Sequence, residues 1–233
     1  MAAKPDTKSK DELTLDEKIG DFIQKNRMRL LFGLGAIVLV IAGFIIVSVV
    51  REKSLSNALS KVDVLNRRYE NLMASISGEE EINASQLSEL VVLLEDITEF
   101  EKKNSGFPAA RAYSINANIY MEQENWALAE EKWLKAAEAA PKSYLAPIAI
   151  YNAAVAAEEQ ENIEAAIAYY ARAAGYEGSF PAAARAQFSV GRLEEARNNK
   201  DSAIAAYRNL LAKWPNDPVW PNLAQNRLLI LSD

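Results

Sequence analysis

The sequence contains no cysteine and no histidine among its 233 residues. Without cysteine it can form no disulfide, thiolate zinc site, iron–sulfur cluster or cysteine nucleophile. Without histidine it has no Ser-His-Asp triad, no histidine-bound metal and no imidazole for acid–base catalysis. Its nine glycines include no phosphate-binding G-x-x-x-x-G-K-[ST] loop. We therefore expect a protein that is not an enzyme and that has no catalytic residue, metal or cofactor.

Basic residues are also in the minority. Lysine and arginine number 26 against 32 acidic residues, which gives a formal net charge of -6. Nucleic-acid binding depends on clustered basic side chains that contact phosphates. We therefore expect no nucleic-acid partner, and a protein partner that is basic or amphipathic.

One long run of the sequence has no charge at all. It extends over 21 residues, from Leu30 to Val50, and as a helix it would measure about 31 Å, close to the hydrocarbon thickness of a bilayer. Residues 30–50 are therefore predicted to form a single transmembrane helix. The preceding tail, residues 1–29, is predicted to contain a short amphipathic helix, because Thr14 and Glu17 have the spacing of a capping box.

The flanking charges predict the orientation of this helix. Lys25, Arg27 and Arg29 precede the run, whereas Arg51 and Lys53 follow it. A short tail with the larger positive charge favours a cytoplasmic N-terminus. In a bacterium, the C-terminal domain of a single-pass inner-membrane protein would then lie in the periplasm.

A helical hairpin is predicted over residues 51–104. Its first helix has an apolar residue at alternating steps of three and four, namely Leu55, Ala58, Val62, Leu65, Tyr69, Leu72 and Ile76. After the acidic turn at Glu79–Glu81, a second helix continues the rhythm with Leu87, Leu90, Leu94 and Ile97. The two stripes can face each other in an antiparallel hairpin. The alternative is a homodimer in which residues 55–76 of two copies form a parallel coiled coil.

The remaining chain, residues 105–233, has an internal period of 37 residues. Alanines recur at Ala129, Ala166 and Ala203, and an aromatic residue follows each by four positions, at Trp133, Tyr170 and Tyr207. Small residues precede the alanines by twelve positions, at Ala117, Ala154 and Gly191. Small residues at these offsets let two helices approach closely, and the aromatic ring fills the space to the next pair.

These segments resemble tetratricopeptide repeats. The first matches the family pattern at Ala117, Tyr120, Ala129, Trp133, Ala136 and Pro141, and the third at Gly191, Ala203, Tyr207 and Pro215. The second departs from the pattern at Ala157 and Gly178, and the period exceeds the family's 34 residues by three. The resemblance implies an all-α fold, with an α-solenoid of about three repeats and a C-terminal capping helix. The hairpin at 51–104 is a candidate degenerate repeat.

The resemblance also implies a partner-binding groove, because the first helix of each repeat lines the concave surface in this family. The residues expected there are Arg111, Ser114, Asn118, Ile148, Tyr151, Asn152, Val155, Arg185, Phe188 and Arg192. Aromatic and arginine side chains suit the capture of a peptide or helix. The carboxylate clamp of some family members is matched poorly, because two of its three cations are replaced by Ser114 and Ser189. The alternative is that Tyr151 and Phe188 pack against the flanking repeats.

An anchor followed by repeats resembles the bacterial family that includes the ancillary subunit of the Sec translocon. That resemblance implies a protein-binding adaptor which assists secretion or recruits chaperones near the translocon. The alternative is a structural scaffold component of an envelope machine, such as the periplasmic flagellar motor or the division apparatus.

Overall fold

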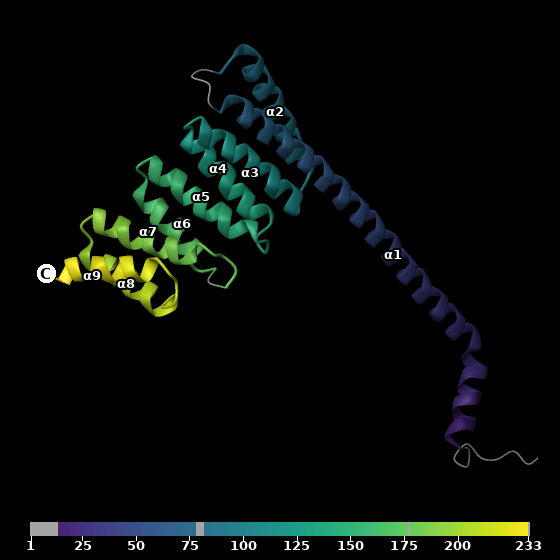
Figure 1. The fold of residues 1–233 in the computed structure, drawn as a ribbon. Helices are drawn as coiled ribbons and strands as arrows, with labels where there is room; N and C mark the ends of the chain where they lie inside the picture. The colour runs from purple at the N-terminus through teal and green to yellow at the C-terminus, as the bar shows by residue number, and fades with distance from the viewer. Residues whose placement is uncertain (1–13, 78–81, 177, 233) are drawn as a thin grey trace, which may run out of the picture. The chain divides into compact units, whose positions relative to one another are not determined.

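The computed structural model describes residues 14–77, 82–176 and 178–232. The expected turn at residues 79–81 and the first 13 residues of the predicted tail lie outside these ranges. Within them the chain forms nine helices and no strand, and the helices are labelled in Figure 1. The helices are α1 (Leu15–Ile76), α2 (Ala84–Lys103), α3 (Gly106–Glu122), α4 (Trp126–Ala139), α5 (Leu145–Glu159), α6 (Ile163–Ala174), α7 (Ala183–Ala196), α8 (Lys200–Lys213) and α9 (Trp220–Ser232). The predicted all-α class is confirmed.

Helix α1 begins at the predicted capping box. The backbone N–H of Thr14 donates to Oε2 of Glu17 at 2.9 Å, and the N–H of Glu17 donates to Oγ1 of Thr14 at 3.5 Å. No proline interrupts the sequence between residues 15 and 76. One unbroken helix therefore contains part of the predicted tail, the predicted transmembrane helix and the first helix of the predicted hairpin. The boundaries at residues 29, 50 and 104 stay predictions.

By length and composition, α1 is the one helix of the described residues that could cross a membrane. The side chains of its apolar stretch are exposed rather than packed against the protein. A single-pass anchor is consistent with both observations. The chain divides into two compact units at Ser56 and Asn57, and the following description concerns the second.

In the second unit, the end of α1 and helix α2 form the predicted antiparallel hairpin. Nε2 of Gln86 donates to the carbonyl of Ser75 at 3.0 Å, and Arg68 forms an ion pair with Asp96 at 2.6 Å. The core of this hairpin joins residues of α1, α2 and α3, which are Val62, Leu65, Leu72, Leu90, Leu93, Ile97, Phe100, Ala112, Ile115 and Ile119. From Val62 to Leu72, the stripe that a parallel dimer would use is therefore covered within one chain, whereas Leu55 is 48% exposed.

The predicted inner face of α2 is wrong at one position. Leu87 is 54% exposed, whereas Leu90, Leu93 and Ile97 are buried. The polar residue Gln86 lies inward in its place, because its side chain both closes the capping box with Asn83 and bonds to α1. The departure is confined to the first turn, since Leu90 and Ile97 are buried as expected and Leu94 packs partly against the same core.

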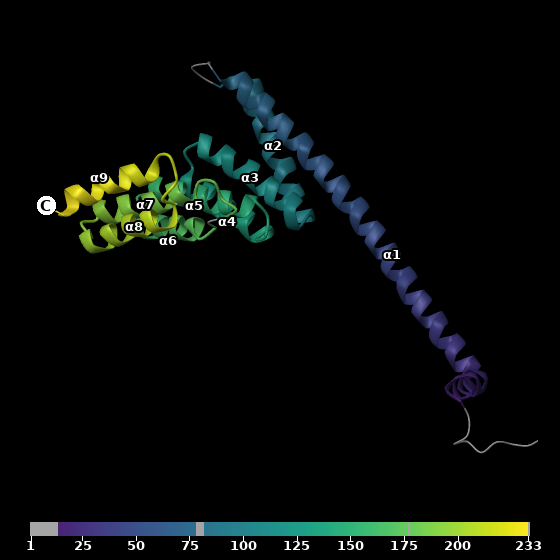
Figure 2. The same ribbon diagram turned by 60° about the horizontal axis from the view of Figure 1, so that its bottom comes forward.

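Helices α3 to α8 form three hairpins, which Figures 1 and 2 show as successive pairs. The turn inside each hairpin repeats with the 37-residue period. Glu124, Glu161 and Asn198 have φ of 55°, 59° and 61°, a left-handed conformation that costs most non-glycine residues about 1 kcal/mol. The next residue in each turn donates its N–H to a carbonyl five positions earlier, for example Asn162 to Ala157 at 2.9 Å.

The cores confirm the role of the small residues. Ala117, Ala154 and Gly191 are buried, as are Trp133, Tyr170 and Tyr207. In the third hairpin the approach leaves no room for a side chain, because a Cβ added to Gly191 would lie 2.5 Å from a ring carbon of Tyr207. The helix predicted after the third hairpin is present as α9, and Asp217 caps its first turn through the N–H groups of Val219 and Trp220.

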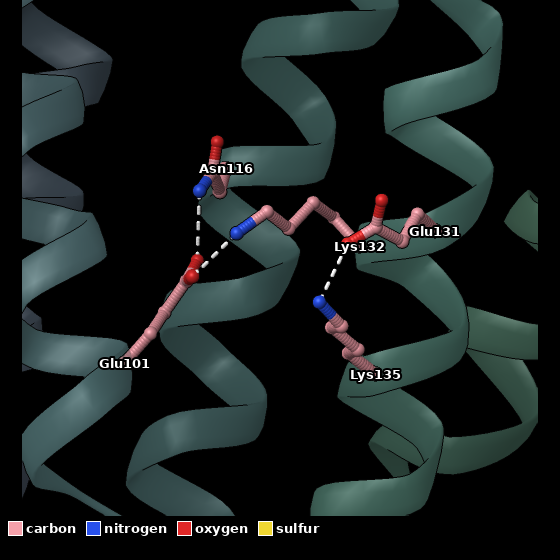
Figure 3. A network of polar contacts seen from close by, with 5 residues as sticks. All are labelled: Glu101, Asn116, Glu131, Lys132 and Lys135. Atoms are coloured by element: carbon pink, nitrogen blue, oxygen red, sulfur yellow. Dashed lines mark hydrogen bonds and ion pairs between the residues drawn. The ribbon is translucent and has the colours of Figure 1, made fainter.

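A buried polar network joins α2 to the first hairpin (Figure 3). Oε2 of Glu101 in α2 pairs with Nζ of Lys132 in α4 at 2.5 Å, and Oε1 accepts from Nδ2 of Asn116 in α3 at 2.8 Å. The Lys132 and Glu101 side chains are 13% and 4% exposed. The nearby pair of Lys135 and Glu131 lies within α4 and is exposed to solvent. The buried pair with Asn116 therefore fixes three helices together, whereas the exposed pair lies within one helix.

Candidate protein-binding surface

The residues predicted to bind a partner lie on α3, α5 and α7, the first helices of the three hairpins. They differ in exposure. Arg185 and Arg192 are exposed, and most of the others are half-buried. Ser114 is buried and its hydroxyl donates to the carbonyl of Ala110 at 2.9 Å, so it lies inside the protein and not on the accessible face.

The contribution of α3 to this surface is reduced by contacts within the protein. Arg111 pairs with Asp63 of α1 at 2.5 Å, which uses the guanidinium that the sequence analysis assigned to a partner. Asn118 stays half-buried on the same helix. The predicted partner-binding side chains that remain accessible therefore lie mainly on α5 and α7.

Tyr151 is the aromatic centre of the α5 and α7 face. Its ring contacts Tyr170 at 5.2 Å and Phe180 at 5.8 Å between centroids, and the guanidinium of Arg185 lies 5.5 Å from the ring centroid. Burial raises the pKa of the Tyr151 hydroxyl. The ring thus packs in the solenoid, as one alternative expected, while the arginine stacked on it is open to solvent. Ile148 and Val155 also pack partly against the central core.

A polar unit of tyrosine, glutamate and arginine lies beside this face. Glu158 at the end of α5 accepts from the Tyr170 hydroxyl at 3.2 Å and pairs with Arg192 of α7 at 2.7 Å. The unit recurs one period later. There Glu195 accepts from the Tyr207 hydroxyl at 3.1 Å and from Nε of Arg227 at 3.0 Å.

The protonation of the second unit follows from these contacts. The hydrogen bond from Arg227 lowers the pKa of Glu195, and the Tyr207 hydroxyl acts in the same direction. Burial, with the adjacent carboxylate, raises the pKa of Tyr207 to about 12. At neutral pH the unit therefore holds a carboxylate, a neutral phenol and a guanidinium.

The first repeat has an apolar version of the same unit. Met121, Trp133 and Val155 occupy the positions that lie 37 residues before Glu158, Tyr170 and Arg192. Met121 and Val155 pack against the central core. The indole N–H of Trp133 is buried without a hydrogen-bond partner in the described part of the chain, because methionine stands where glutamate provides the acceptor in the later repeats.

A pocket of about 450 Å³ opens at the second polar unit. It is lined by Phe188, Arg192, Glu195, Ala196, Tyr207 and Arg227. Phe188 also packs against Tyr207 and Trp220, with centroids 5.4 and 5.3 Å apart. The pocket offers an aromatic wall beside two arginines that are already paired with Glu158 and Glu195. It therefore suits an aromatic side chain of a bound peptide.

Sequence reasoning missed Glu158, Glu195 and Arg227. The 37-residue spacing of the two glutamates was present in the sequence as a signal, as was their separation of twelve residues from Tyr170 and Tyr207. The arginines did not show the same spacing, because Arg192 and Arg227 are 35 residues apart. Within the described residues, no group of three or more acidic side chains is placed to hold a metal ion.

Comparison with known proteins agrees with this repeat geometry. Residues 151–218 match the model of the tetratricopeptide repeat family. The chain is 35% identical over 127 residues to a TPR repeat-containing protein of Treponema pallidum (strain Nichols), an alignment that covers 54% of this chain and 52% of the relative. The chain thus spans about half the length of the curated relative it matches. Both matches support a tetratricopeptide repeat fold for the helical hairpins, a fold typical of protein-interaction scaffolds.

Proposed function

We propose that this protein is a membrane-anchored adaptor that binds other proteins through the α5 and α7 face of its repeats. The observation that carries the proposal is the exposed Arg185 stacked on Tyr151, next to the pocket at Phe188 and Arg192. Arginine and aromatic side chains are enriched among the residues that dominate binding energy at protein interfaces. The repeat fold and the apolar helix α1 support an adaptor held at a membrane.

The cellular role that we propose follows from the resemblance stated for the sequence. The tail would be cytoplasmic and the repeats periplasmic, at the inner membrane of a bacterium. There the adaptor would hold chaperones or emerging polypeptides near the translocon. A fixed component of an envelope machine is the competing role.

The orientation is tested by single cysteines, since the native chain has none. Ser56→Cys and Lys18→Cys place one thiol at an exposed position on either side of the apolar run. In cells with a permeabilised outer envelope, a membrane-impermeant thiol reagent should label Cys only in the Ser56 variant. Labelling of the Lys18 variant alone would overturn the periplasmic placement.

The binding face is tested by a photo-crosslinking amino acid in place of Arg185. This position is exposed, whereas Tyr151 is half-buried against other rings. The matched control is Arg172, an exposed arginine of α6, a second helix of a hairpin. Adducts at Arg185 with translocon subunits, chaperones or many exported chains would support the secretion adaptor.

Two other outcomes of the crosslinking test would count against the secretion adaptor. One or two proteins in constant ratio at Arg185 would replace the secretion adaptor by a scaffold component. Equal adducts at Arg185 and Arg172, or none at Arg185, would refute recognition by this face.

A further inference from the structure

Helix α7 carries an exposed cation and an aromatic pocket on the same face. Arg185, Phe188, Arg192 and Ala196 follow one another at steps of three and four residues, so their side chains leave the same side of the helix. Phe188, Arg192 and Ala196 line the pocket of about 450 Å³, together with Tyr207 of α8. One ligand of this face can therefore contact both Arg185 and the pocket.

The two arginines of the pocket are neutralised within the protein. Arg192 pairs with Glu158 at 2.7 Å. Arg227 pairs with Glu195, which also accepts from Nε of this arginine at 3.0 Å. A charged side chain in the pocket would have to break one of these pairs or lose its water without a new partner. The uncharged part of the lining includes the ring of Phe188, which favours an uncharged aromatic side chain.

Arg185 differs from these two arginines. Among the described residues, which do not include Glu177, it forms no ion pair or hydrogen bond. Its guanidinium lies 5.5 Å from the centroid of the Tyr151 ring. A guanidinium stacked on a ring keeps N–H groups that can donate to a carboxylate. Arg185 therefore favours an acidic side chain of a ligand.

The distance between these two features suits one short peptide. Arg185 precedes Phe188 by three residues and Ala196 by eleven, which corresponds to about 5 to 16 Å along a helix. Two to four residues of an extended peptide cover about 7 to 13 Å, the middle of that range. An acidic side chain at Arg185 and a ring in the pocket can thus come from residues two to four positions apart.

We propose that the α5 and α7 face binds an extended peptide segment of a partner protein in which an acidic residue lies two to four positions from an aromatic residue. The acidic side chain pairs with Arg185, and the aromatic ring enters the pocket beside Phe188. One carboxylate suffices, so the segment is amphipathic and not strongly acidic, in keeping with the net charge of -6 on this chain. The inference rests on the proposed function, because it names the ligand of the same face.

The test measures the binding of short peptides to the full chain in lipid nanodiscs by fluorescence anisotropy of a dye on the peptide. Each peptide has one glutamate and one phenylalanine, two to four positions apart and in either order, among serine, threonine and glycine. Both ends are blocked, so a terminal carboxylate cannot contribute. We expect saturable binding for at least one spacing. Exchange of the glutamate for lysine, or of the phenylalanine for alanine, should weaken binding about tenfold.

Variants of the protein assign the two contacts. Arg185→Glu should weaken binding of the glutamate peptide about tenfold and should bind the lysine peptide more tightly than the parent does. Ala196→Leu places a larger side chain in the pocket and should remove the preference for phenylalanine over alanine. Arg172→Glu makes the same charge change on exposed α6 and should alter neither. An unchanged Tm would show that each variant is folded.

The inference is overturned if no peptide binds saturably, or if Arg185→Glu and Ala196→Leu leave binding unchanged. Photo-crosslinks from Arg185 in cells separate this failure from that of the proposed function. Adducts with partner segments that lack an acidic and an aromatic residue at this spacing would overturn the inference alone. Absence of adducts at Arg185 would refute the proposed function and the inference with it.

Discussion

The buried pair of Glu101 and Lys132 gives the sharpest prediction for the stability of the repeats. We consider Lys132→Met, which keeps the length and helix propensity of the side chain but removes its charge. The change leaves the Glu101 carboxylate buried, with the amide of Asn116 as its remaining partner. Breaking a buried ion pair in this way typically costs about 3 to 5 kcal/mol. We therefore expect Lys132→Met to lower the free energy of unfolding by about 3 to 5 kcal/mol at pH 7, because the carboxylate stays buried without its cation.

The matched control is Lys135→Met, three residues along the same helix. Its pair with Glu131 is exposed, and such pairs between positions i and i+4 contribute about 0.3 to 0.5 kcal/mol. The double variant Glu101→Gln with Lys132→Met removes both buried charges and keeps an oxygen that can accept from Asn116. It should recover most of the stability that the single variant loses.

Urea unfolding followed by tryptophan fluorescence measures these differences, because the four tryptophans all lie in the repeats, at Trp126, Trp133, Trp214 and Trp220. The full chain is studied in detergent micelles at pH 7. An equal loss for Lys132→Met and Lys135→Met would refute the reasoning. So would a failure of the double variant to recover any of the stability that Lys132→Met loses.

Three further predictions concern the repeats. Gly191→Ala should lower the free energy of unfolding by about 1 to 2 kcal/mol, because overpacking against the Tyr207 ring exceeds the gain in helix propensity; a higher Tm for the variant would contradict the close contact. Glu195→Gln should destabilise the protein at pH 7, and its difference from the parent should shrink progressively as pH falls from about 4.5 through the lowered folded pKa, since a carboxyl group with a lowered folded pKa contributes its full stability only above the ordinary glutamate value. A urea-unfolding difference that is as large at pH 3 as at pH 7 would exclude this linkage. Asn162→Ala should cost about 1 kcal/mol, because its side chain caps α6 through the N–H of Ala165. Asn199→Ala is the control without a side-chain cap, and an equal Tm change in the two variants would argue against capping.

The sequence by itself determined the fold class, the apolar helix and the repeat. Small residues at Ala117, Ala154 and Gly191 with rings at Trp133, Tyr170 and Tyr207 can be recognised from spacing alone, because each hairpin uses the same local packing. Both terminal caps, at Thr14 and at Asp217, follow from residue types a few positions apart. Such features depend on contacts that are near in sequence.

Only the tertiary structure decided which side chains are accessible. Leu87 is expected in the core from its spacing but is exposed, because the capping box and the bond to α1 turn Gln86 inward at the first turn of α2. Arg111 is not a free cation for a partner, because it pairs with Asp63, which lies 48 residues away in the sequence. Glu158 forms an ion pair with Arg192, which lies 34 residues further along the sequence. Contacts between successive hairpins depend on how those hairpins stack, which a periodic sequence pattern does not specify.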